Sequence, residues 1–175
     1  GLRMVSPQTD FDFFPFATNL RTMEMSRVLQ AKDRARKADL AIVVVGENSM
    51  RYMWKDKTCG ENVDRYELSL VGLQQQLVEE IYATGVPTIV VLVNGRPLEL
   101  NRLEPVSDAI LEIWQPGVNG ALPMAGILSG RINPSGKLAM TFPYSTGQIP
   151  IYYNRRKSGR GHQGFYKDIT SDPLY

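Results

Sequence analysis

Two uninterrupted runs of apolar, mostly β-branched residues do most to limit the folds open to this chain. Residues 40–45 (LAIVVV) end at a glycine, and residues 88–93 (TIVVLV) end at an Asn-Gly pair. A strand with one wet face alternates apolar and polar residues, whereas such continuous runs are typical of parallel strands buried on both faces. We therefore expect two central strands of a mostly parallel sheet.

Helical and shorter extended segments lie around these two runs. Residues 24–37 and 73–81 carry apolar side chains at helical spacing, and residues 120–130 predict a short helix. Residues 109–114 and 138–142 predict two further strands. Helices alternating with strands in this way predict an α/β layer fold.

The two ends of the chain differ in composition from the middle. Residues 1–23 are rich in phenylalanine and irregular, so we expect an aromatic N-terminal arm that packs on another surface. Residues 24–144 hold the periodic segments and form the expected sandwich domain. Residues 145–175 are rich in Gly, Pro, Tyr and Arg and predict an extended C-terminal wrap of the same domain.

Composition excludes several classes of protein. The 175 residues are 43% hydrophobic and 22% charged, with a net charge of +2, which is too small to indicate a nucleic-acid or anionic-membrane partner. The longest apolar run is far shorter than the roughly 20 residues that a bilayer span needs. A single cysteine, Cys59, leaves no internal disulfide, and with a single histidine, His162, it argues against a zinc site. We expect no metal and no cofactor.

Three short motifs imitate known binding sites and fail on inspection. Gly46 follows a strand, but the next residues (ENSMR) lack the second glycine of a dinucleotide fingerprint. Residues 130–138 (GRINPSGKL) have five residues instead of four between their glycines and no hydroxyl after the lysine, so we expect a turn rather than a P-loop. Residues 155–161 (RRKSGRG) are interpreted as a solvated basic loop.

Ligands of open parallel sheets lie beyond the carboxyl ends of the strands, which here means residues 46–65, 94–97 and 115–120. An exposed indole in a polar loop would be unusual without a partner surface, so Trp54 is a substrate-binding candidate. Trp114, at a strand end, fits a sugar platform or a core side chain equally well.

Among the acids that follow the first strand run, Glu47, Glu61, Asp64 and Glu67 are weighed as candidates. A general acid must keep its proton near the working pH, which requires partial burial or a neighbouring carboxylate. Each acid taken alone is more often a surface residue, and no second carboxylate on another element is evident.

Six segments are informative in combination: AIVVVGE, CGENVDRYELSLVGLQQQLVEEI, PTIVVLVNGRPLEL, SDAILEIWQPGVNG, GILSGRINPSGKLAMTFPYSTGQIPIYYN and YKDITSDPLY. In their order and spacing the chain resembles, over residues 24–175, the C-terminal α/β sandwich domain of glycoside hydrolase family 3, the β-glucosidase and β-xylosidase family. The resemblance implies a three-layer α/β sandwich with a mostly parallel sheet, flavodoxin-like or Rossmann-like.

The resemblance also implies roles for individual residues. The pattern Glu-x-x-x-Arg places the family's glutamate acid/base at Glu61. Arg65 falls on a family position that we interpret as tying the loop to the sheet, and it is also a substrate-binding candidate. Gln74 falls on a structural position in the first turn of a helix. Glu47 is a weaker catalytic candidate, because it follows its strand so closely that it is not expected to reach a neighbouring domain.

The implied whole enzyme is a retaining β-glycosidase that hydrolyses terminal β-D-glycosides. Its nucleophile would lie on a (β/α)8 barrel domain that these residues do not include, so we expect the isolated domain to be inactive. Its partners would be that barrel and a β-linked oligosaccharide or aryl glycoside, with no nucleic acid and no membrane. Family habit implies a periplasmic or secreted bacterial protein.

A non-catalytic carbohydrate-binding or protein-interaction module that kept the fold is the alternative. The phenylalanines between residues 11 and 16 motivate it, since exposed aromatic side chains often mark a partner surface.

Overall fold

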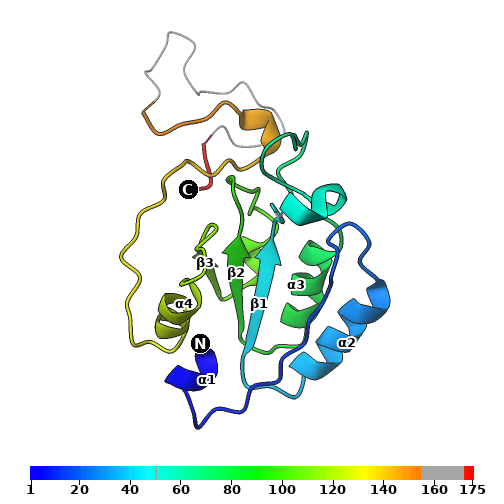
Figure 1. Cartoon of the computed structure of the whole chain (residues 1–175), viewed down its shortest axis with the longest axis vertical. Helices are drawn as coiled ribbons and strands as arrows, with labels where there is room; N and C mark the ends of the chain where they lie inside the picture. The colour runs from blue at the N-terminus through cyan, green and yellow to red at the C-terminus, as the bar shows by residue number, and fades with distance from the viewer. Residues whose placement is uncertain (50, 155–171) are drawn as a thin grey trace.

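A computed structural model of the chain describes residues 1–49, 51–154 and 172–175. Its centre is a sheet of three parallel strands, β1 (Ala41–Gly46), β2 (Thr88–Val93) and β3 (Ala109–Glu112), in the order β1-β2-β3. The three arrows point the same way in Figure 1. Both predicted strand runs are confirmed, but only β2 is central, because β1 lies at an edge of the sheet in the described part of the chain.

Helices flank this sheet. The helices α2 (Met25–Ala35) and α3 (Gln74–Tyr82) pack on each other beside β1, whereas α1 (Leu2–Val5) and α4 (Ala121–Leu128) lie together near β3 (Figure 1). Short 3-10 helices complete the described elements: η1 (Arg51–Asp56), η2 (Glu104–Val106) and η3 (Thr146–Gln148). Helices around an open parallel sheet confirm the expected α/β class.

The alternation of side chains along β1 decides where the core lies. Val43 and Val45 are buried with Val90 and Leu92 of β2 in the main apolar cluster, which also takes in apolar residues of α2 and α3. Val44 points to the opposite face of the sheet and is 57% exposed. The side of the sheet that carries α2 and α3 is therefore the fully packed one.

The aromatic arm packs on α2. Phe14 lies against the main cluster, and its ring is covered by the guanidinium groups of Arg27 at 4.2 Å and Arg34 at 5.0 Å. Arg34 also pairs with Asp12. The sequence predicted an irregular arm, but the arm begins with the short helix α1. The domain boundaries at residues 23 and 144 stay predictions.

The prediction of a strand at residues 138–142 is wrong, because the segment is not part of the sheet. The N–H of Phe142 donates to the carbonyl of Tyr175, and the carbonyl of Phe142 accepts from the N–H of Leu174 at 3.0 Å. Phe142 is buried against Trp114, whereas Leu138 is 47% exposed. The segment therefore pairs with the C-terminal residues instead of with β3.

The basic segment 155–161 and His162 lie outside the described residues. Within the described part of the chain, the helices are too short or too polar for any of them to span a lipid bilayer.

The carboxyl end of β1 is held by a side chain of α3. Gly46 adopts a φ of 144°, and a Cβ atom there would lie 2.0 Å from the carbonyl oxygen of Val93, so only glycine fits. The Gly46 N–H donates to Oε1 of Gln74 at 2.8 Å, and Nε2 of Gln74 donates to the Gly46 carbonyl at 2.8 Å. The buried glutamine therefore supplies hydrogen-bond partners for the main chain of Gly46 on the edge of β1 that faces away from β2.

Replacing Gln74 by alanine should remove both of these hydrogen bonds and leave a buried N–H and a buried carbonyl unpaired. We expect Gln74→Ala to lower the free energy of unfolding by about 2–4 kcal/mol in urea titrations. Gln76→Ala, at an exposed position of the same helix, is the matched control and should change stability little. Equal effects of the two substitutions would contradict this role of Gln74.

Candidate active site

A long polar loop, residues 47–70, follows β1 and lies over the carboxyl edge of the sheet. Its η1 helix lies just beyond the β1 arrowhead in Figure 1. The base of the loop is closed by Asn48 and Thr58: the Thr58 N–H donates to the Asn48 carbonyl at 2.8 Å, and the Asn48 N–H donates to Oγ1 of Thr58 at 2.8 Å. The loop therefore returns to the sheet before it reaches Glu61.

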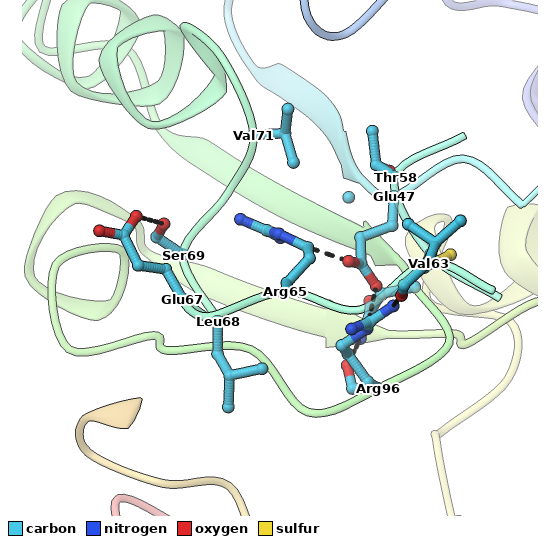
Figure 2. Close-up of polar contacts among 12 residues, drawn as sticks. Glu47, Thr58, Val63, Arg65, Glu67, Leu68, Ser69, Val71 and Arg96 are labelled. Carbon is cyan, nitrogen blue, oxygen red and sulfur yellow. Dashed lines mark hydrogen bonds and ion pairs between the residues drawn. The ribbon is translucent and has the colours of Figure 1, made fainter. Parts of the chain in front are cut away.

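Glu47 is a buried anchor. Its N–H donates to the Val93 carbonyl at 2.8 Å, and its side chain has no exposed surface. The carboxylate lies between two guanidinium groups, with Oε1 3.3 Å from Nη1 of Arg65 and Oε2 3.4 Å from Nε of Arg96 (Figure 2). A carboxylate enclosed in this way is not presented to a substrate.

The two arginines link separate loops to this carboxylate. Arg65 comes from the loop after β1 and is 14% exposed, whereas Arg96 follows β2 and is 23% exposed. Arg96 also donates from Nη2 to the Val63 carbonyl at 3.1 Å. This geometry fits the interpretation of Arg65 as a tether better than its interpretation as a substrate ligand. Sequence reasoning placed residues 94–97 at this edge but assigned Arg96 no role.

Cys59 belongs to the same buried cluster. It is 1% exposed, and burial raises the pKa of its thiol, an effect that the negative charge of Glu47 reinforces. Nε2 of Gln115 lies 3.7 Å from the sulfur and 2.8 Å from Oγ of Ser49. The side chain is thus a small protonated packing residue that lies between two loops.

Glu61 is exposed, in contrast to Glu47. It occupies a tight turn in which the Val63 N–H donates to the Gly60 carbonyl at 3.1 Å. Asn62, the third residue of the turn, has a φ of 59°, which a type II turn requires and asparagine tolerates. The loop therefore presents Glu61 at its surface, four residues before the buried end of Arg65.

Of the two tryptophans, Trp54 remains the better recognition candidate. Its side chain is 55% exposed on η1. Trp114 is half-buried, packs against the main cluster and lies 5.8 Å from the ring of Phe142. The backbone N–H of Trp114 donates to Oε1 of Glu112, and burial raises the pKa of that carboxyl. These contacts favour the core interpretation of Trp114.

No group of three or more His, Cys, Asp or Glu side chains among the described residues is arranged to hold a metal ion. The catalytic and substrate-binding assignments of Glu61, Glu47, Trp54 and Arg65 stay predictions at this point. The geometry does establish that the two candidate glutamates differ in environment: Glu47 is buried and ion-paired, and Glu61 is at the surface.

Cys59 offers a test of how tightly the cluster around Glu47 is closed. Because its pKa is raised in the folded chain, a smaller fraction is thiolate at a given pH than after unfolding, and burial also hinders the reagent. We expect Ellman's reagent at pH 8 to react at least about tenfold more slowly with the folded chain than with the chain in urea. Equal rates would show that the cluster is open.

Comparison with known sequences assigns most of the chain to one family. Residues 16–175 match the family model described as "Glycosyl hydrolase family 3 C-terminal domain". A β-xylosidase of Formosa agariphila is 40% identical over 147 residues, which are 83% of this chain and 19% of that protein. A periplasmic β-glucosidase of Salmonella typhimurium is 37% identical over 154 residues, again 83% of this chain and 19% of that protein.

Comparison with solved structures agrees with the sequence match. The crystal structure of a β-glucosidase from Listeria innocua in complex with isofagomine superposes with a TM-score of 0.78 at 35% identity, over 91% of this chain and 23% of that one. The chain thus spans about a fifth of the length of the relatives that it matches. On the strength of the family match and of these relatives, the chain belongs to glycosyl hydrolase family 3, as its C-terminal domain.

Proposed function

We propose that this domain supplies Glu61 as the general acid/base of a retaining β-glycosidase, over a pocket that a barrel domain completes. One observation carries the proposal: of the two catalytic candidates, Glu47 and Glu61, only Glu61 is exposed. Glu47, the weaker candidate, is enclosed by Arg65 and Arg96 and serves the loop as an anchor.

The chemistry divides between the two domains. Glu61 protonates the leaving glycosidic oxygen as a carboxyl nucleophile of the barrel attacks the sugar, and it then deprotonates the water that releases the glycosyl-enzyme. The two carboxyl groups of a retaining site lie about 5–5.5 Å apart, so the barrel must approach the turn that carries Glu61. Trp54, half-exposed in the same loop, would contact the substrate there.

The relatives suggest the class of substrate. They are named as β-xylosidases and β-glucosidases. A variant of the Listeria innocua β-glucosidase was crystallised in complex with laminaribiose. The β-glucosidase of Salmonella typhimurium is named as periplasmic. We therefore propose terminal β-D-glycosides, in oligosaccharides or aryl glycosides, as substrates and an exported or periplasmic location.

The alternative of a non-catalytic binding module loses part of its motive. Phe14 and Phe16, which suggested an exposed aromatic arm, pack against the main apolar cluster, and only Phe13 is largely exposed, at 80%. The arm is therefore covered mainly by its own domain.

The isolated 175-residue chain should not hydrolyse aryl β-glucosides or aryl β-xylosides. Half of the carboxylate pair that a retaining mechanism needs is assigned to the barrel, so no covalent intermediate forms. The measurement is release of nitrophenol at high protein concentration, compared with the same chain carrying Glu61→Gln. Turnover that Glu61→Gln abolishes would mean that the barrel is dispensable.

Glu61→Gln, in a polypeptide that carries this domain together with its barrel, should lower kcat/KM for poor leaving groups by about 10²–10⁴-fold. Substrates with activated leaving groups such as dinitrophenol need no protonation, so their glycosylation step should be much less affected. Added azide should partly restore turnover, because it attacks the glycosyl-enzyme without a general base.

Glu47→Gln is the matched control. It leaves the charges of Arg65 and Arg96 buried without their partner, so it should lower stability by about 3–5 kcal/mol. Its remaining folded fraction should show no dependence on the leaving group. If the leaving-group dependence appeared in Glu47→Gln and not in Glu61→Gln, then Glu47 would be the acid/base and the assignment of Glu61 would be wrong.

A further inference from the structure

Lys57 is a buried cation in the polar loop. Lys57 as a whole is 3% exposed, and lysine is almost never buried to this extent unless its charge is paired. The carboxylates of the described residues form no ion pair with it. Among the residues that the structure describes, its ammonium group has two other partners, and each belongs to a residue of the proposed active site.

The first partner is the main chain of Glu61. Nζ of Lys57 donates to the Glu61 carbonyl at 2.9 Å. That carbonyl belongs to the central peptide of the turn from Gly60 to Val63, and types I and II of such a turn differ by a flip of this peptide. A hydrogen bond from a charged donor to this oxygen therefore favours one orientation of the peptide, and the positive φ of 59° at Asn62 has the sign that a type II turn needs there.

The second partner is the indole of Trp54. Nζ of Lys57 lies 4.3 Å from the centre of the Trp54 ring, within the range of a cation–π interaction. Because the same nitrogen contacts both groups, the Glu61 carbonyl and the Trp54 ring lie close together, on either side of the Lys57 ammonium. The stem of Lys57 passes beneath Gly60, where an added Cβ would lie 3.7 Å from Cε.

The base of the lysine is fixed from outside the loop. Nη2 of Arg21 donates to the Lys57 carbonyl at 2.9 Å, and the neighbouring Asp56 accepts from Nδ2 of Asn19 at 2.7 Å. The stem therefore starts from a backbone held by the N-terminal arm and ends on the turn that carries Glu61.

We infer that Lys57 is a positioning residue that couples Trp54 to Glu61, an inference that rests on the proposed roles of these two residues. Its ammonium holds the turn in the conformation that presents the Glu61 carboxylate and, through the indole face, holds the substrate-binding tryptophan beside it. Loss of the charge would release both residues together, although Lys57 itself touches no substrate.

The contact with Trp54 can be tested in the 175-residue chain without altering Lys57. In NMR spectra, the ε-methylene and ζ protons of Lys57 should be shifted upfield by the ring current of the indole. Trp54→Leu should return them to the values of an exposed lysine. Ordinary shifts in the unaltered chain would overturn the inference even if every variant at residue 57 failed to fold.

The contact with the turn is tested by Lys57→Met, which keeps most of the stem and removes the charge. We expect exchange of the Val63 amide hydrogen to accelerate about tenfold or more, because the turn loses a charge-assisted hydrogen bond. The Trp54 indole resonance should move at the same time. Lys55→Met, the same change at an exposed lysine two residues earlier, should leave both readouts unchanged. Unchanged exchange and an unmoved indole in folded Lys57→Met would overturn the inference.

A kinetic test separates this inference from the proposed function. In the polypeptide that includes the barrel, Lys57→Met should lower kcat for poor leaving groups more than for activated ones, in the same direction as Glu61→Gln but by a smaller factor. Equal losses on both substrate types would overturn the positioning role. If Glu61→Gln itself shows no dependence on the leaving group, the proposed function fails, and the NMR readouts still decide whether Lys57 couples the two residues.

Discussion

The buried carboxylate of Glu47 is the contact on which the carboxyl edge of the sheet depends. Moving a single carboxylate out of water is costly, and the ion is tolerated because Arg65 and Arg96 approach it from two sides. Each arginine belongs to a different loop, so one charge fixes the relative positions of the loops after β1 and β2. Such a cluster adds little net stability over an apolar one, but it permits few alternative arrangements, since any of them leaves a buried charge unpaired.

The residue before this anchor is held just as firmly by neutral groups. Gly46 approaches the Val93 carbonyl too closely for any side chain, and Gln74 occupies the outer edge of the strand at that point. Two consecutive residues are thus fixed from β2, α3 and two loops at once. The long loop that follows starts from a rigid point, which is necessary because the loop has few apolar contacts of its own.

The fold was more predictable from sequence than the contacts that hold the site. Strand β2 was predicted to the residue, because its continuous apolar run is buried on both faces, whereas the similar run of β1 leaves Val44 exposed at the sheet edge. Residues 138–142 carry the same kind of signal, but their pairing depends on which backbone edge reaches them, and Tyr175 does so in place of β3. In the same way, the family pattern Glu-x-x-x-Arg singled out Glu61 and Arg65 as candidates, whereas the pairing of Arg96 with Glu47 joins loops about fifty residues apart and leaves no local pattern.

A polar loop that must present an acid at the surface cannot be ordered by burying that acid. The chain solves this with charges placed on either side of Glu61: Arg65 is anchored on a buried carboxylate four residues later, and Lys57 is buried four residues earlier with its ammonium on the Glu61 main chain. Both anchors act on backbone or on other side chains, and neither uses the Glu61 carboxylate. The role proposed for Glu61, in a pocket completed by another domain, would require this combination, since the group must be positioned before its partner carboxylate arrives.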